Sequence, residues 1–140
     1  MTRSDFLAPL IGQPWAWRTR NCWDFACHVQ RELFGRALPC ITVPDDPKWK
    51  WMVAEIGRHP ERENWMAVPE GPHGLVKAVD GALCLMGRFS GPGHVGVWLA
   101  DQRKVIHCDR KRGVCLEDDL SLKQQGWIKR TYYEPRSREC

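Results

Sequence analysis

The chain has 140 residues, of which 43% are hydrophobic, and a formal net charge of +4 at pH 7. This length suits one domain with its own core, and the ordinary hydrophobic content argues against disorder. No apolar run approaches the ~20 residues that cross a bilayer, and basic residues are interspersed with acids rather than gathered as in nucleic-acid-binding proteins. The N-terminal residues make a poor signal peptide. We therefore expect a single domain over residues 1–140 that binds neither membrane nor nucleic acid.

The cysteine pattern does not indicate a disulfide framework or a structural metal. The chain has an odd number of cysteines and no Cys-x-x-Cys pair, which favours mostly reduced and buried thiols: Cys22, Cys27, Cys40, Cys84, Cys108, Cys115 and Cys140. His107 and Cys108 with Cys115, or Cys22 with His28, offer soft ligands. Neither set has the paired short spacings of structural zinc. We expect no metal and no cofactor, and a zinc-stabilised binding module stays as an alternative.

The sequence places one cysteine at the start of an amphipathic helix. Asn21 is a good N-cap, Cys22 follows in the first turn, and Gly35 ends the helix. The apolar stripe of this helix repeats with helical spacing: Phe25, Ala26, Val29 and Leu33. Unpaired backbone N–H groups and the helix dipole there favour a thiolate. The pattern thus predicts that Cys22 is a reactive nucleophile, labelled by iodoacetamide ahead of the other cysteines near neutral pH.

The rest of the N-terminal half predicts shorter elements. Residues 4–13 form a short helix that Pro14 stops, and the proline-punctuated residues 38–44 are extended. Residues 47–58 form another helix. Residues 59–74 read as a loop because prolines and glycines recur through them.

From residue 75 onward the pattern predicts strands. Short apolar or alternating runs are separated by turn residues: residues 82–86, 94–99, 104–108, 113–116 and 127–133, with a turn at residues 91–93. Helices come first and a strand meander follows, so the fold class is α+β with the N-terminal helices packed on an antiparallel sheet.

The hairpin between two of these strands predicts a pair of histidines. If Asp101 and Gln102 form its loop, Gly96 pairs with His107. Side chains alternate along a strand, so His94, Gly96 and His107 share one face of the sheet. The two imidazoles are then diagonal neighbours within reach of each other.

A helix-borne thiol packed on that face would complete a hydrolase site. Cys22 would be the nucleophile, His94 the general base, and His107 the group that orients His94. Backbone N–H groups near Cys22 would hold the oxyanion. The chemistry is acyl transfer to water through a thioester.

The same motifs resemble the NlpC/P60 family of cysteine peptidases. They are Pro14-Trp15, Asn21-Cys22-Trp23, Gly93-His94-Val95-Gly96-Val97-Trp98-Leu99 and Val105-Ile106-His107. The resemblance spans residues ~11–133, with an insert at about 41–74. It implies a papain-like fold, a Cys22-His94-His107 triad and hydrolysis of the peptide stems of bacterial cell wall, often beside D-glutamate and diaminopimelate.

Three further residues follow from this resemblance. Trp15 stands where the family often has a tyrosine that helps the oxyanion, and Trp23 adjoins the nucleophile. Asp24 stands where the family has a small residue, and its charge opposes thiolate formation. We expect Trp15, Trp23 and Asp24 to be the substrate-binding residues.

The helix tail Arg31-Glu32-Leu33-Phe34-Gly35 looks most like bacteriophage tail versions of the family. The expected protein is thus a peptidoglycan hydrolase of a phage tail, made in the host cytoplasm and acting in the cell wall, with tail-tip proteins as partners. A secreted effector amidase and a catalytically weak structural tail protein of the same fold are the alternatives.

Overall fold

The protein folds around one antiparallel sheet. The computed structural model describes residues 1–88 and 92–136, and of Trp49 only the backbone. Within these residues six strands pair in the order β1-β6-β2-β3-β4-β5: β1 Trp65–Val68, β2 Leu83–Gly87, β3 His94–Leu99, β4 Lys104–Asp109, β5 Gly113–Glu117 and β6 Lys129–Pro135. The α-helices are α1 Arg3–Leu7, α2 Cys22–Phe34, α3 Trp49–Arg58 and α4 Asp119–Gln124, with short 3₁₀ helices at Pro60–Asn64 and Pro72–Gly74. No helix in the described part is long and apolar enough to span a membrane.

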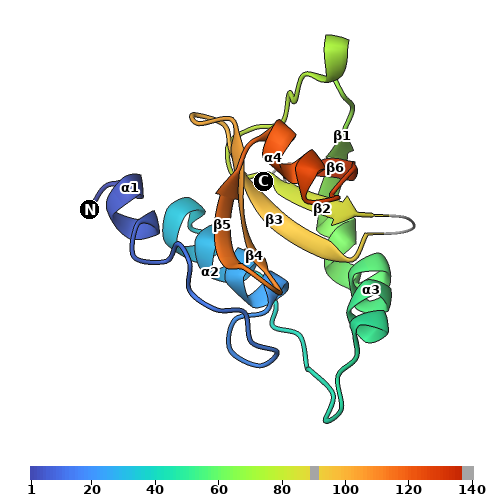
Figure 1. Ribbon diagram of the computed structural model, residues 1–140. Coiled ribbons are helices and arrows are strands. Elements are labelled where there is room, and N and C mark those ends of the chain that lie inside the picture. The colour runs from blue at the N-terminus through green and yellow to red at the C-terminus, as the bar shows by residue number, and fades with distance from the viewer. Residues whose placement is uncertain (89–91, 137–140) are drawn as a thin grey trace.

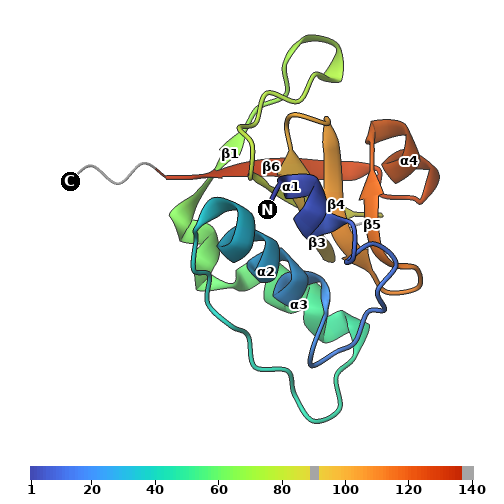
Figure 2. The same ribbon diagram turned by 90° about the vertical axis from the view of Figure 1, so that its left-hand side faces the viewer.

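The two faces of the sheet bury different sets of side chains. The first face packs against α1, α2 and α3, as Figures 1 and 2 show. Its buried strand side chains are Trp65, Leu83, Val95, Val97, Leu99, Ile106, Cys108 and Val114. The second face packs against α4 and the segment that follows it. Its strand side chains are Cys84, Met86, Trp98, Val105 and Tyr132. The expected α+β architecture is confirmed. The strands carry apolar side chains on both faces of the sheet, so both faces must be covered by other elements.

Helix α2 forms as its sequence predicts. The Asn21 side chain accepts the backbone N–H of Asp24 at 2.8 Å, and Gly35 takes the left-handed conformation that ends the helix, with φ 64°. Near its C-terminal end the buried Gln30 donates to the carbonyl of Gly81 at 2.7 Å. The helix is therefore capped at one end and tied to the start of β2 at the other.

Three local predictions are corrected, and one element was not predicted at all. Helix α1 ends at Leu7 rather than at residue 13, since Pro9 has no N–H to continue it. Strand β1 lies inside residues 59–74, where a loop was expected. Helix α4, capped by Asp118, was not predicted, and β6 begins two residues later than expected. These elements are short and depend on distant partners: β1 pairs with β6, some 70 residues away in the chain.

The register of the β3–β4 hairpin is confirmed. Gly96 pairs with His107 across the two strands, and the turn runs from Ala100, whose carbonyl accepts the N–H of Arg103 at 3.3 Å. Asp80 steadies this turn by accepting the N–H of Ala100 at 2.9 Å. The expected turn at residues 91–93 includes Gly91, which lies outside the described residues.

Replacing Gly96 with alanine should destabilise the protein. A Cβ at Gly96 would lie 2.5 Å from Cγ1 of Val105 and 3.0 Å from both Cβ of His107 and the carbonyl oxygen of Ile106. The added methyl must displace buried neighbours, so the free energy of unfolding should fall by about 1–3 kcal/mol in urea titration. Gly57→Ala is the control, because nothing lies within 4 Å of a Cβ there. Equal stability of the two variants would contradict the close packing.

Candidate active site

Buried polar side chains form a continuous hydrogen-bonded chain on the second face of the sheet. Nε2 of His94 lies 2.8 Å from Nδ1 of His107, and Nε2 of His107 lies 2.8 Å from Oε1 of Glu117. Arg112 donates to both oxygens of Glu117, at 2.7 and 3.2 Å. The two histidines are at most 1% exposed. The structure thus brings His94 and His107 together as expected and adds a carboxylate and a guanidinium to them.

His94 contacts His107 and Trp127, and one of its two ring nitrogens has no hydrogen-bond partner among the described residues. Its ring stacks on Trp127, with centroids 4.6 Å apart and an interplanar angle of 15°. Its Nδ1 is buried and has no hydrogen-bond partner among the described residues. Burial lowers the pKa of His94 well below its ordinary value, and electrostatic interactions with His107, Arg88 and Arg112 lower it further. The imidazole is therefore neutral, with an unused atom at Nδ1.

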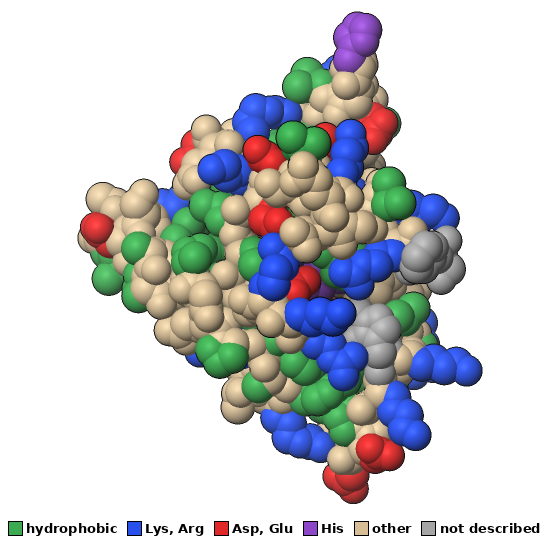
Figure 3. Space-filling view, viewed as in Figure 1, with side chains coloured by type: hydrophobic (Ala, Val, Ile, Leu, Met, Phe, Trp, Pro, Cys, Tyr) green, Lys and Arg blue, Asp and Glu red, His purple; other side chains and the backbone are tan. Residues whose placement is uncertain are grey.

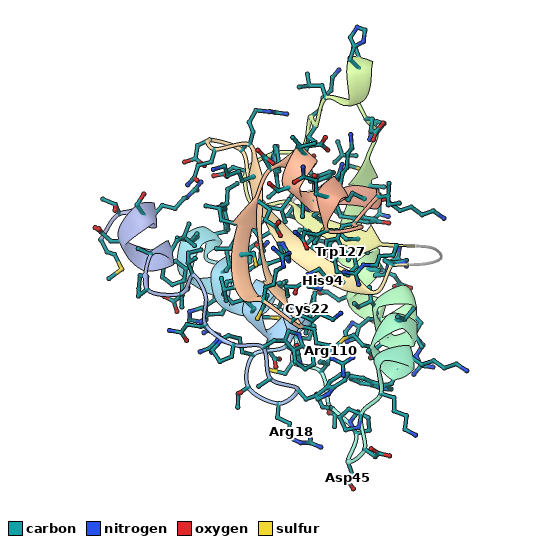
Figure 4. The ribbon with its side chains drawn as sticks, viewed as in Figure 1. Arg18, Cys22, Asp45, His94, Arg110 and Trp127 are labelled. Carbon is teal, nitrogen blue, oxygen red and sulfur yellow. The ribbon has the colours of Figure 1, made fainter. Side chains whose placement is uncertain are left out.

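Cys22 lies against the beginning of strand β3. The backbone N–H of Val95, the residue after His94, faces its sulfur. In Figure 4 the labels of Trp127, His94 and Cys22 stand one below another in this view. The sulfur is not exposed, and burial raises the pKa of the thiol to about 12 against the opposing effect of nearby backbone N–H groups. The expected thiolate is therefore wrong for this conformation: burial outweighs the helix start.

The packing of α2 also differs from expectation. The helix lies on the first face of the sheet, against Val95, whereas His94 and His107 belong to the second face. The assumption that helix and histidines share one face is wrong. Cys22 is the first residue of α2 and His94 the first of β3, so both stand at the beginning of their elements.

The three expected substrate-binding residues have different surroundings. Trp15 packs edge-on against Trp17, and the guanidinium of Arg110 lies over both rings. Nε1 of Trp15 is buried without a partner among the described residues. Burial raises the pKa of Cys27, further along α2, to about 12, and the nearby charge of Asp24 raises it further.

Trp23 forms one wall of an apolar cleft between the sheet and α3. Its Nε1 donates to the carbonyl of Pro39 at 2.9 Å, so its polar group is already used. The cleft has a volume of about 50 Å³. Besides Trp23 its apolar lining includes Met52, Ile56, Leu83 and Val95. Residues 41–74 therefore contribute one wall of this cleft.

A basic hollow opens directly on His94. Its lining consists of Arg88, His94, Asp109, Arg110, Lys111 and Trp127, and its volume is about 190 Å³. Figure 3 shows basic side chains gathered in the middle of this face of the molecule. Three cations and one acid surround the imidazole, so the hollow attracts anionic groups.

Sequence reasoning missed Glu117, Arg112 and Trp127 as site residues. Glu117 pairs with Val105 on the neighbouring strand, and Val105 is two residues from His107 on the same face. Aligning the sequence of β5 with that of β4 in this register would have predicted that Glu117 lies next to His107. Among the described residues, no group of three or more His, Cys, Asp or Glu side chains could hold a metal ion.

The fold has a counterpart among solved structures. It matches the crystal structure of the NlpC/P60 domain of the peptidoglycan hydrolase SagA with a TM-score of 0.50 over 91% of this chain and 92% of that chain. The two sequences are 19% identical. The chain therefore has the α+β, papain-like NlpC/P60 fold. No protein-family model and no curated protein matches the sequence.

Thiol labelling should start away from Cys22. Of the six cysteines in the described residues, Cys40 is exposed whereas Cys22 is fully buried. Because alkylation needs an accessible thiolate, iodoacetamide at neutral pH should modify Cys40 well before Cys22 in the folded protein. Peptide mapping by mass spectrometry measures the order, with urea-unfolded protein as the control. Labelling of Cys22 first would mean that an open, reactive form dominates in solution.

Glu117 should make stability depend on pH in the acid range. The hydrogen bond from His107, followed by the contacts with Arg112, lowers the pKa of Glu117 from 4.5 to about 2. Its contribution is complete above the unfolded value and is lost as the pH falls from 4.5 towards 2. The loss should be at most about 3 kcal/mol. Urea unfolding at pH 6 and pH 3 should show a smaller drop in Glu117→Gln than in wild type; equal drops would contradict this.

Proposed function

We propose that this protein is a cysteine peptidase that hydrolyses the peptide stems of bacterial peptidoglycan. The observation that carries the proposal is the unpartnered Nδ1 of His94, at the end of a buried polar chain and at the strand start against which Cys22 lies. A neutral imidazole whose free lone pair can take a proton from a thiol is the arrangement that a nucleophile and its general base require. The fold is that of a domain from a peptidoglycan hydrolase.

The reaction would proceed by acyl transfer. His94 takes the thiol proton at Nδ1 while the sulfur of Cys22 attacks the peptide carbonyl carbon. The oxyanion forms near the N–H groups at the start of α2 and the unpartnered Nε1 of Trp15. The C–N bond then breaks, His94 returns the proton to the leaving amine, and a thioester remains. Water, deprotonated by His94, hydrolyses the thioester and restores the thiol.

The pKa shifts indicate how this step starts. Burial raises the pKa of Cys22 and lowers that of His94, so the resting pair is a neutral thiol and a neutral imidazole. Proton transfer would therefore accompany attack on the substrate, as in serine hydrolases, rather than precede it.

The surface around His94 fits an acidic peptide. Peptide stems of the cell wall carry free carboxylates, and Arg88, Arg110 and Lys111 line the hollow that leads to the imidazole. Such cations attract anionic substrates over a distance that salt shortens. This charge supports the expected substrate class.

For the route to the cell wall we propose delivery by a phage tail, with tail-tip proteins as partners. The likeness of residues 31–35 to phage tail versions of the family supports it. Injection by a bacterial secretion machine would serve the same chemistry. The genes that neighbour this one distinguish the two.

A second candidate function is a structural tail protein of the same fold that turns over slowly or not at all. The complete burial of Cys22 and the raised pKa of its thiol favour it. The two candidates differ in one respect: tail incorporation would not need Cys22, whereas hydrolysis would.

Replacing Cys22 with alanine should abolish cleavage of purified muropeptides, because no other group forms the thioester. The products of wild type and variant are compared by mass spectrometry, and circular dichroism confirms the fold. Cys27→Ala, on the same helix but one turn further on, is the control and should retain activity. Cleavage that persists in Cys22→Ala would exclude the mechanism. Inactive wild-type protein would favour the structural candidate.

A further inference from the structure

We infer that Glu117 is a positioning residue that fixes the tautomers of both buried histidines, so that His94 offers its lone pair at Nδ1. The inference deepens the proposed function and rests on it for its catalytic meaning. It concerns hydrogen-bond polarity, which the free protein itself reports.

The carboxylate of Glu117 can only accept hydrogen bonds. Arg112 donates to both oxygens of Glu117. The Glu117 side chain is only 8% exposed, so its charge is held in a site that has little water. These contacts keep the pKa of Glu117 far below neutral. At physiological pH the oxygen that faces His107 therefore carries no proton to donate.

For a neutral His107, which the inference assigns, this fixed end determines every proton along the chain. Because Glu117 accepts, the N–H of His107 must be at Nε2, 2.8 Å from the carboxylate oxygen. A neutral His107 then has its lone pair at Nδ1, which accepts from His94 across 2.8 Å. His94 must in turn carry its N–H at Nε2 and its lone pair at Nδ1. Nδ1 is the atom that has no partner among the described residues.

The opposite tautomers would remove the base. If His107 donated from Nδ1, then Nε2 of His94 would accept and Nδ1 of His94 would carry the proton. Such an imidazole cannot take a proton from Cys22 in the proposed step. In wild type this tautomer of His107 would place two acceptors, Nε2 of His107 and Oε1 of Glu117, next to each other with no proton between them. In a buried site that mismatch is costly.

Glu117 also acts through its charge. When His94 takes the thiol proton it becomes cationic among Arg88 and Arg112, which already oppose that charge. Arg110, Lys111 and Asp109 border the hollow on its open side, and Lys104 and Asp118 lie beyond Glu117. The negative charge of Glu117, which is hydrogen-bonded to His107, stabilises the imidazolium of His94 through His107.

Nitrogen NMR of the free wild-type protein tests the tautomers directly. Long-range ¹H–¹⁵N spectra of histidine-labelled protein at pH 7 should show Nε2 protonated and Nδ1 unprotonated in both His94 and His107. A proton at Nδ1 of His94 would overturn the inference. This measurement needs neither a substrate nor a variant, so it separates the inference from the proposed function.

The variant Glu117→Gln tests the consequence. Its amide can donate as readily as accept, so the histidine signals should shift towards a mixture of tautomers. If the protein cleaves muropeptides, kcat should fall about 10²-fold or more with little change in KM, and the pH–rate profile should shift. Glu134→Gln is the matched control: this half-buried carboxylate accepts the N–H of Val79 at 2.7 Å on another part of the sheet.

Each outcome decides the matter. Unchanged tautomers and unchanged kcat in Glu117→Gln would overturn the inference, as would equal effects in Glu134→Gln. Partial recovery in Glu117→Asp, which keeps an acceptor-only group, would support it. Should Glu117→Gln fail to fold, the wild-type spectrum still decides. Wild-type protein with the expected tautomers but no cleavage would refute the proposed function and leave the positioning role standing.

Discussion

The packing of α2 against the first face of the sheet is the constraint on which the site depends. Phe25, Ala26 and Val29 bury their side chains against Val95 and its neighbours, which fixes the helix along β3. The capped start of the helix then lies at the start of that strand. The position of Cys22 against the backbone N–H of Val95, at the start of β3, is thus a consequence of apolar packing, and the polar groups themselves need not draw it there.

The two histidines are polar side chains in the core, so their imidazoles need hydrogen-bond partners there. Leaving a buried polar group unpaired costs about 1–3 kcal/mol. The chain from His94 through His107 to Glu117 satisfies these groups in sequence, and Arg112 balances the charge at its end. Among the described residues Nδ1 of His94 has no hydrogen-bond partner, and it is the nitrogen that the proposed chemistry uses.

Burial and reactivity oppose each other at Cys22. A helix start stabilises a negative charge by about 0.3–1 kcal/mol. The rise in the pKa of Cys22 from 9.0 to about 12 corresponds to a larger effect, on the order of 4 kcal/mol, in the other direction. Desolvation therefore wins, and the thiol rests in its neutral form. Reaction then requires that the base, the substrate and the oxyanion donors act together on a thiol that is otherwise inert.

The sequence by itself determined the features that local chemistry fixes: the cap at Asn21, the end of α2 at Gly35, and the pairing of Gly96 with His107. Each depends on residues a few positions apart or on one tight turn. Only the tertiary structure decided which face α2 covers, the pairing of β1 with β6, and the join of Glu117 to His107. These depend on contacts between distant segments, because burial is a property of the whole packed chain. For that reason the helix start predicted a reactive thiol at Cys22, and the fold made it a buried and neutral one.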